Sequence, residues 1–162
     1  MLQTQQQLLA VLDENQIDYQ NHEHPAVYTV EEAARHSDGI DGAHSKNLFL
    51  KDKKKNLFLV VTLADKPVVL KEVATKIGAK HLSFGKPELL GEVLGVIPGA
   101  VTPFAVINSN GHPLKVILDR EMMDSGTLNF HPLENTATTT ISAENLIRFI
   151  EYCGVDYEVT LL

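Results

Sequence analysis

The sequence predicts an α/β domain in which helices surround a mixed β-sheet. Helical and strand patterns alternate irregularly along the chain, and turn signals join several neighbouring strands. No linker or low-complexity segment divides the 162 residues, a length typical of one domain with one core. Apolar residues make up 44% and charged residues 22%, as in an ordinary globular protein. We therefore expect a single domain over residues 1–162.

Local patterns place the elements of the first half of the chain. Pro25 ends a predicted strand because proline donates no ladder hydrogen bond, and Gly78 ends a predicted helix. The polar run 51–55 is too charged to bury, so it must turn in solvent between two hairpin strands. The predicted elements are helices over about 4–15, from Thr29, over 69–77 and over 87–93, and strands over 19–24, 47–50 and 56–59.

Strands dominate the predicted second half. The dipeptide Asn110-Gly111 is a hairpin signal between the first two of them. Ser142 is a capping residue for a last helix, which ends at Gly154. The predicted strands cover residues 104–107, 114–118, 127–130, 137–140 and 157–161.

Composition excludes several classes of protein. No apolar run approaches the roughly 20 residues needed to span a bilayer, so no membrane partner is expected. The N-terminal segment lacks the basic start and the cleavage site of a signal peptide. The single cysteine, Cys153, excludes an internal disulfide framework. We expect a cytoplasmic protein.

Charge is distributed unevenly along the chain. The formal net charge is −7, yet ten of the fourteen basic residues lie between Lys46 and Lys86. Three acidic residues oppose them, which leaves +7 in this segment and −14 in the rest. A basic segment on an acidic body can meet phosphates locally while the remainder repels polyanions. A solvated, lysine-rich face is the alternative interpretation.

Two features are able to carry chemistry. The segment 95–105, punctuated by glycine and proline, can aim backbone N–H groups at a carbonyl oxygen or a phosphate, although it also fits an ordinary helix-to-strand connection. Lys46 begins an apolar strand, where its ammonium group can bind a phosphate or a polarised carbonyl. Asn47 beside it can donate or accept hydrogen bonds. A solvent-facing strand end is the alternative for both residues.

Metal and nucleophile chemistry is poorly supported. His22 and His24 share one face of a predicted strand, but no cysteine or acidic pattern completes a zinc site, so no metal is expected. Cys153 fits a small core residue, and the chain has no nucleophile elbow or Walker loop. His131 stands where a predicted strand opens into a loop. It can position a hydroxyl group or water, or serve only the structure.

Six segments carry a pattern that belongs to one known family: 23–33, 44–52, 99–105, 130–136, 138–142 and 146–149. Together they resemble the YbaK/prolyl-tRNA-synthetase-associated editing family. The match is closest to its ProX branch, the stand-alone deacylases of alanyl-tRNA(Pro). The resemblance covers nearly the whole chain in order, and the ordered set is far more specific than any one segment.

The resemblance implies a partly curled, mostly antiparallel mixed sheet with helices around it. The substrate would be the ester that joins an amino acid to the terminal adenosine of tRNA, cleaved without a metal or organic cofactor. We further expect the substrate's own ribose hydroxyl to position or activate the attacking water. The implied catalytic residues are Lys46, Asn47, Gly99 and His131, and the candidate substrate-binding residues are Val27, Tyr28, Phe49, Ala100, Val101, Thr102 and Pro103.

Selectivity in such a protein follows from a second sieve. A synthetase pocket shaped for proline cannot strongly exclude alanine, because lost methylenes are worth only about 1–3 kcal/mol. The expected partner is the acceptor end of tRNA(Pro), with help from prolyl-tRNA synthetase or an elongation factor. Related family members favour cysteine, so cysteinyl-tRNA(Pro) or another small aminoacyl-tRNA is an alternative substrate. A non-catalytic module that binds an aminoacylated end or a nucleotide is the alternative function.

Overall fold

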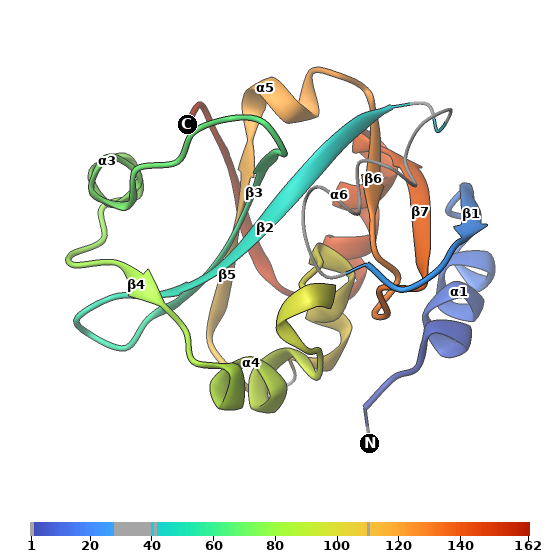
Figure 1. Cartoon of the computed structure of the whole chain (residues 1–162), viewed down its shortest axis with the longest axis horizontal. Helices are drawn as coiled ribbons and strands as arrows, with labels where there is room; N and C mark the ends of the chain where they lie inside the picture. The colour runs from blue at the N-terminus through green and yellow to red at the C-terminus, as the bar shows by residue number, and fades with distance from the viewer. Residues whose placement is uncertain (1, 28–39, 41, 110) are drawn as a thin grey trace.

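A computed structural model of the chain describes residues 2–27, 40, 42–109 and 111–162. In these residues, eight strands form one mixed sheet with helices packed around it (Figure 1). The strands are β1 (Tyr19–Glu23), β2 (Ala43–Lys51), β3 (Leu57–Leu63), β4 (Ser83–Phe84), β5 (Leu114–Asp119), β6 (Thr127–Phe130), β7 (Ala137–Ser142) and β8 (Asp156–Thr160). The α-helices are α1 (Gln5–Glu14), α3 (Leu70–Ile77), α4 (Pro87–Leu94), α5 (Arg120–Met123) and α6 (Ala143–Tyr152), and the 3-10 helices are η1 (Pro98–Ala100) and η2 (Pro103–Asn108).

The sheet has the strand order β1-β7-β6-β2-β3-β5-β8, with β4 paired to β2. The pairs β1–β7, β6–β7, β2–β3 and β2–β4 are antiparallel. The pairs β2–β6, β3–β5 and β5–β8 are parallel. The predicted mixed, mostly antiparallel sheet with surrounding helices is confirmed, and β2 is the strand that joins its two halves.

Local signals account for the helix ends. Thr4 caps α1 through a capping box with Gln7. Gly78 ends α3 in the left-handed conformation, at φ 72°, which glycine adopts without steric cost. Pro87 begins α4, and the Ser142 hydroxyl accepts a hydrogen bond from a backbone N–H of α6. These elements confirm the predicted helices over 4–15, 69–77 and 87–93 and the helix after Ser142.

Side chains on the two faces of the central strands enter different apolar clusters. Phe49 and Leu59 belong to the larger core, which also takes side chains from α1, α4, η2 and α6. Leu50 and Val60, one residue further along each strand, belong to a smaller cluster with α3. This alternation is the period-two pattern of strands buried on both faces.

The prediction of a strand over residues 104–107 is wrong. This segment lies in the 3-10 helix η2, and the Thr102 hydroxyl accepts a hydrogen bond from the N–H of Phe104 at its start. Pro103 suits the first position of a helical turn, and the buried side chains of η2 pack between α4 and α6. The predicted hairpin at Asn110-Gly111 is therefore wrong as well, because β5 pairs in parallel with β3 and β8.

The predicted helix that begins at Thr29 lies outside the described residues. Within the described part of the chain, no helix is long and apolar enough to cross a membrane.

Candidate functional site

An opening in the sheet lies beside the middle of β2. One edge of β2 pairs with β3 along residues 45–51. The other edge pairs with β6 only at residues 43–44 and with β4 only at residues 50–51. Among the described residues, no strand neighbours Lys46–Leu48 on that edge, and we call this gap the β2 opening. A strand edge without a neighbour presents backbone N–H and C=O groups that can pair with a ligand.

Lys46 and Asn47 project from opposite faces of β2, because side chains alternate along a strand. Asn47 shares its face with Phe49 of the larger core. Its side-chain oxygen Oδ1 is buried and finds no hydrogen-bond donor among the residues that the structure describes. Leaving a buried acceptor unsatisfied costs about 1–3 kcal/mol, so this oxygen is a candidate acceptor for a ligand.

The Lys46 side chain is held by a polar network on the other face of the sheet. Its ammonium group donates a hydrogen bond to the backbone carbonyl of Lys66. The Lys66 ammonium group binds Asp119 at 2.9 Å and Glu121 at 2.8 Å. Asp119 is fully buried and also accepts a hydrogen bond from Thr62, which pairs with Lys46 across β2 and β3.

The charges in this network shift the pKa values of both partners. Burial acts to raise the pKa of Asp119, but hydrogen bonds from Lys66 and Thr62 outweigh it, and the net pKa is lowered. Burial likewise acts to lower the pKa of Lys66, while its bonds to Asp119 and Glu121 raise the net value. Both groups are therefore charged at neutral pH, and the Lys66 turn that receives Lys46 is firmly anchored.

His131 stands one residue beyond β6, where β6 and β2 separate. Its Nδ1 lies 2.9 Å from the carbonyl oxygen of Ala137, which can only accept, so Nδ1 carries the hydrogen. Burial lowers the pKa of His131; the bond to Ala137 opposes this shift, and the nearby His24 adds to it. The ring is therefore neutral at pH 7, with Nε2 as a hydrogen-bond acceptor.

Hydrogen bonds between residues 24–27 and residues 135–136 hold the loop that carries His131, and we call the two bonds between Val27 and Asn135 the Asn135 clasp. The Asn135 side chain donates to the Val27 carbonyl at 2.7 Å, and the Val27 N–H donates to the Asn135 carbonyl at 3.2 Å. The His24 N–H donates to the Thr136 carbonyl, and the rings of His24 and His131 meet edge to face with centroids 6.2 Å apart. These contacts bring the predicted pocket residue Val27 to the same loop as His131.

The glycine loop is attached to the same region through aromatic packing. Gly99 lies in η1, and Val101 leads from it into the buried residues Thr102 and Pro103. Phe104, the next residue, packs its ring against Phe130 with centroids 6.0 Å apart. Ala100 and Phe49 belong to the same apolar cluster as these rings. The loop is therefore anchored one residue away from His131.

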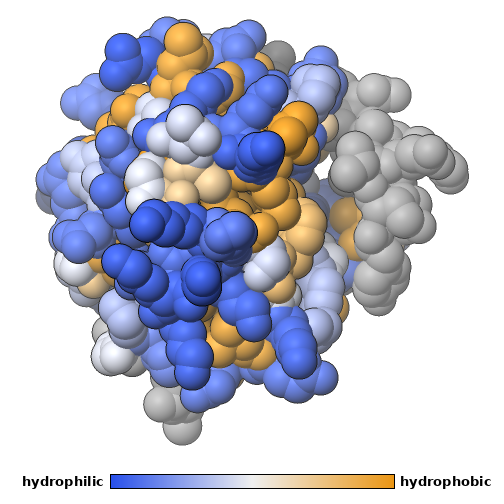
Figure 2. Space-filling view, turned by 90° about the vertical axis from the view of Figure 1, so that its left-hand side faces the viewer, coloured by the Kyte–Doolittle hydropathy of each residue, from blue (hydrophilic) through white to orange (hydrophobic). Residues whose placement is uncertain are grey.

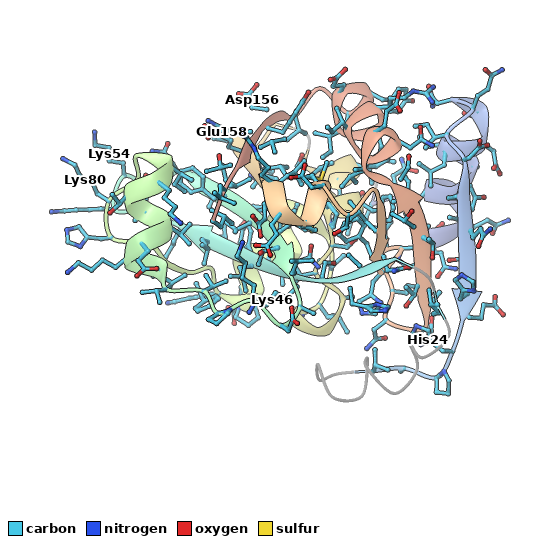
Figure 3. The ribbon with its side chains drawn as sticks, turned by 90° about the horizontal axis from the view of Figure 1, so that it is seen from above. His24, Lys46, Lys54, Lys80, Asp156 and Glu158 are labelled. Carbon is cyan, nitrogen blue, oxygen red and sulfur yellow. The ribbon has the colours of Figure 1, made fainter. Side chains whose placement is uncertain are left out.

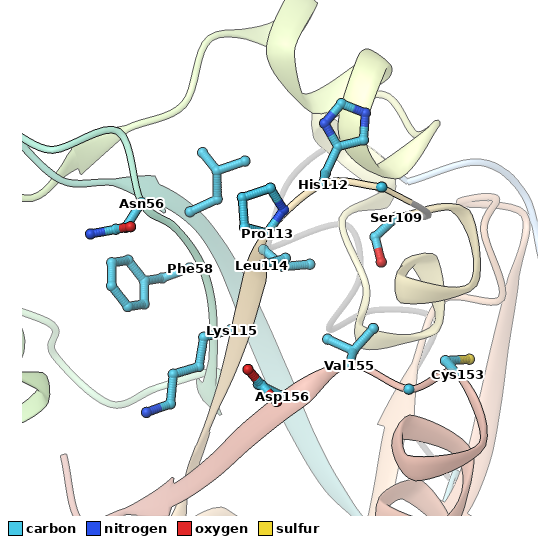
Figure 4. Close-up of a pocket in the computed structure, with 13 residues that line it drawn as sticks. Asn56, Phe58, Ser109, His112, Pro113, Leu114, Lys115, Cys153, Val155 and Asp156 are labelled. Carbon is cyan, nitrogen blue, oxygen red and sulfur yellow. The ribbon is translucent and has the colours of Figure 1, made fainter.

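Two cavities lie away from the β2 opening. One of about 410 Å³ is bounded by the first residues of β3, β5 and β8 and includes Lys115, Cys153 and Asp156 (Figure 4). Burial raises the pKa of the Cys153 thiol to about 12, so this thiol is not a nucleophile at neutral pH. The other, of about 690 Å³, lies between α1 and β1 and is lined in part by His24. No group of histidine, cysteine and acidic side chains in the described chain is arranged to hold a metal ion.

The structure links several of the predicted site residues to one another and separates Lys46 from them. The 99–103 loop is joined to His131 through the packing of Phe104 on Phe130, and Val27 is joined to the His131 loop by the Asn135 clasp. Asn47 shares its face of β2 with Phe49 of the larger core, whereas Lys46 projects to the other face. Tyr28 lies outside the described residues. Sequence reasoning missed the roles of His24 and Asn135 in supporting His131. The one local signal for these roles was the dipeptide His24-Pro25 at the end of a predicted strand.

Comparisons with known proteins agree on one family. Residues 24–149 match the model of the aminoacyl-tRNA editing domain. The chain is 41% identical to prolyl-tRNA synthetase associated domain-containing protein 1 of Danio rerio over 131 residues, which cover 80% of this chain and 71% of the relative. It is 35% identical to the prolyl-tRNA editing protein ProX of Acetoanaerobium sticklandii over 155 residues, which cover 94% of each chain.

A solved structure of similar fold has a sequence that has diverged much further. The crystal structure of a candidate trans-editing enzyme for prolyl-tRNA synthetase superposes with a TM-score of 0.71. The match covers 100% of this chain and 99% of that one, with 18% sequence identity. At this identity the likeness supports the fold alone.

Proposed function

The chain belongs to the aminoacyl-tRNA editing domain family, and we propose that it is a trans-editing hydrolase that removes a wrongly attached small amino acid, alanine above all, from tRNA(Pro). The proposal is carried by the β2 opening. Asn47 contributes a buried acceptor without a donor on one side of this gap, and His131 contributes a neutral ring at its end. The aminoacylated 3′ end of a tRNA offers the ammonium and hydroxyl donors that such acceptors require.

The reaction is the hydrolysis of an ester. A water oxygen forms a bond to the ester carbonyl carbon, the bond between that carbon and the ribose oxygen breaks, and the ribose oxygen takes up a proton. The described residues around the opening include no carboxylate pair arranged as acid and base, so we assign activation of the water to the free ribose hydroxyl of the substrate. Nε2 of His131 accepts a hydrogen bond from that hydroxyl or from the water.

Backbone groups are the proposed stabilisers of the developing negative oxygen. The 99–103 loop is anchored by Phe104 between Phe130 and Phe149, so its backbone is held rigidly. The N–H of Ala100 already donates within the η1 turn, which leaves the other N–H groups of the loop as donors. Pre-organised donors of this kind are worth about 3–4 kcal/mol each in measured oxyanion sites. No metal or organic cofactor enters this scheme.

Lys46 is assigned to the phosphate or ribose of the terminal nucleotide. Its ammonium group now bonds to the Lys66 carbonyl, a neutral acceptor that a phosphate oxygen can replace with a stronger, charge-assisted bond. Because Lys46 and Asn47 leave opposite faces of β2, one substrate reaches both only at an edge without a neighbouring strand. The β2 opening provides such an edge among the described residues.

Selection of a small amino acid is assigned to the apolar side of the opening. Phe49 and Val27 are buried, and an added Cβ at Gly85 would lie 2.4 Å from the Phe49 ring. Side chains packed this tightly cannot shift far enough to admit a larger amino acid of the substrate. A pocket of this kind accepts alanine and sterically refuses proline.

The decisive experiment is release of amino acid from tRNA(Pro) charged separately with alanine, cysteine or proline, with the protein in catalytic amounts. Multiple turnovers on the alanyl ester with the prolyl ester spared are expected. Preferential release of cysteine would keep the chemistry and change the substrate. Retention of one charged tRNA per protein without release would replace the enzyme with a binding module.

A further inference from the structure

One end of the molecule carries exposed lysines that the proposed chemistry does not use. They come from the β2–β3 turn, from α3 and from the segments on either side of β4. We call this set the lysine end: Lys53, Lys54, Lys55, Lys71, Lys76, Lys80 and Lys86, all exposed. None of them forms a salt bridge with any residue that the structure describes, whereas Lys66 and Lys115 outside the set are both paired with carboxylates.

The lysine end is a folded surface because backbone contacts join its parts. The N–H of Lys53 donates to the carbonyl of Lys80 at 2.9 Å, which fixes the β2–β3 turn against the segment after α3. Asp52, the acidic residue within the turn, is 8% exposed and accepts hydrogen bonds from the backbone N–H groups of Lys54 and Asn56. Its charge is directed into the turn, and the seven exposed lysines outnumber the two exposed carboxylates between Lys53 and Lys86, Asp65 and Glu72.

The lysine end lies at the opposite end of the molecule from His24. Figure 2 views the α3 end of the molecule directly and shows it as largely hydrophilic with an apolar band across it. In Figure 3, Lys54 and Lys80 project from that end, and Lys46 lies between them and His24. Strand β2 connects the two regions: Lys46 and Lys51 are five residues apart, about 17 Å at the usual rise of a strand.

We propose that the lysine end binds the phosphodiester backbone of the tRNA acceptor stem while the charged 3′ end occupies the β2 opening. This proposal rests on the proposed function and adds the surface on which the tRNA lies. A duplex strand places a phosphate about every 3.4 Å, so a stem alongside β2 presents several phosphates over this distance. The residues outside 46–86 carry a formal charge of −14, which repels the rest of the tRNA and restricts its orientation.

An anionic membrane fits the lysine end less well than RNA does. Helices that lie on membranes insert an apolar face between the lipids. The apolar residues Val73 and Ala74 of α3 are instead buried against the sheet, and Val73 belongs to the smaller cluster. The exposed apolar residues at this end, Val69 before α3 and Phe84 in β4, come from two different elements and not from one helix face. Lysines spread around them suit a phosphate backbone, which is read by charge and without insertion.

The test uses the full chain and the double variant Lys54→Gln/Lys80→Gln, with Lys115→Gln as the matched control. Lys115 is exposed to 43% and lies outside the lysine end. The dissociation constant for tRNA(Pro) without an attached amino acid is measured between 50 and 200 mM salt. If both lysines contact phosphates, the double variant loses about two units of salt slope, so its affinity falls about tenfold less over this range. The control keeps the wild-type slope.

Kinetics then separate this surface from the chemistry. The ratio of kcat/KM for alanyl-tRNA(Pro) to kcat/KM for the alanyl ester of adenosine should fall in the double variant and stay constant in the control. Wild-type protein that binds tRNA with the expected slope but cleaves neither ester would refute the proposed function and leave this surface standing. A double variant with unchanged slope and ratio would overturn the surface. Binding of phosphatidylserine vesicles in place of tRNA would overturn it as well.

Discussion

The buried polar groups on the two faces of β2 differ in whether they find hydrogen-bond partners. On the Lys46 face, Asp119 accepts hydrogen bonds from the Thr62 hydroxyl, the Lys66 ammonium group and two backbone N–H groups. On the Asn47 face, the side-chain oxygen of Asn47 meets no donor in the described part of the chain. A satisfied network rigidifies a fold, whereas an unsatisfied acceptor lowers stability unless a ligand completes it. The contrast assigns structural support to the Asp119 network that holds Lys46, and it makes the Asn47 oxygen the acceptor that only a substrate can complete.

The largest expected effect is on the support side. Asp119→Ala removes the buried partner of Lys66, which breaks the network that receives Lys46. Removing one member of a buried ion pair costs several kcal/mol, and Glu121 compensates in part, so we expect a loss of about 3 kcal/mol in the free energy of unfolding. Urea denaturation measures it. The control, Glu121→Ala, removes a carboxylate exposed to 58% and should cost less than about 1 kcal/mol.

The same urea denaturation, repeated at low pH, tests whether the stability lost in Asp119→Ala comes from the charge of Asp119. The pKa of Asp119 is lowered in the folded state, so its charge stabilises the fold above the ordinary value of 3.8. This stabilisation is lost as the pH falls through the lowered folded-state pKa. The difference between wild type and Asp119→Ala should therefore shrink in strong acid. A difference that is constant with pH would mean that packing, not charge, is lost.

The next effect in size concerns Lys46. Lys46→Ala should leave the fold intact and lower kcat/KM for alanyl-tRNA(Pro) by about 10- to 100-fold, because a hydrogen bond to a charged group is worth about 1.5–3 kcal/mol. Thermal unfolding and single-turnover deacylation measure the two quantities. Lys115→Ala is the matched control. Wild-type activity in Lys46→Ala would remove this residue from the site.

A smaller change sharpens the comparison on the substrate side. Asn47→Leu replaces an amide whose oxygen is unsatisfied with an apolar group of similar size next to the larger core. The free energy of unfolding should stay equal or rise by about 1 kcal/mol, while deacylation falls at least about tenfold. Loss of both stability and activity would show that Asn47 serves the fold.

The smallest effect is the pH dependence set by His131. Its folded-state pKa is lowered below the ordinary 6.5, so the unfolded state binds more protons as the pH falls through that value. Stability should therefore decrease below about pH 6.5, by at most about 1.4 kcal/mol per pH unit for one proton. Urea denaturation of wild type and His131→Gln at several pH values measures this, with His112→Gln as control. Equal slopes in wild type and His131→Gln would contradict the assignment.

The sequence by itself determined the elements whose signals are local. The capping residue Thr4, the helix-ending Gly78 and the charged turn after Lys51 each act on neighbouring backbone within a few residues. Their physical effect does not depend on the rest of the fold, so four of the predicted helices and the first hairpin were predicted correctly, while the helix from Thr29 lies outside the described residues. The ordered motifs likewise sufficed to indicate the family.

Only the tertiary structure decided the elements and contacts that depend on distant residues. Residues 104–107 have the apolar character of a strand, yet burial between α4 and α6 places them in the 3-10 helix η2. The Asn135 clasp joins residues 108 positions apart, and the Asp119 pair joins residues 53 apart. The β2 opening exists because β6 and β4 pair with different ends of one strand. No local pattern encodes which strand edge remains without a neighbour, because that edge is set by the pairing of the whole sheet.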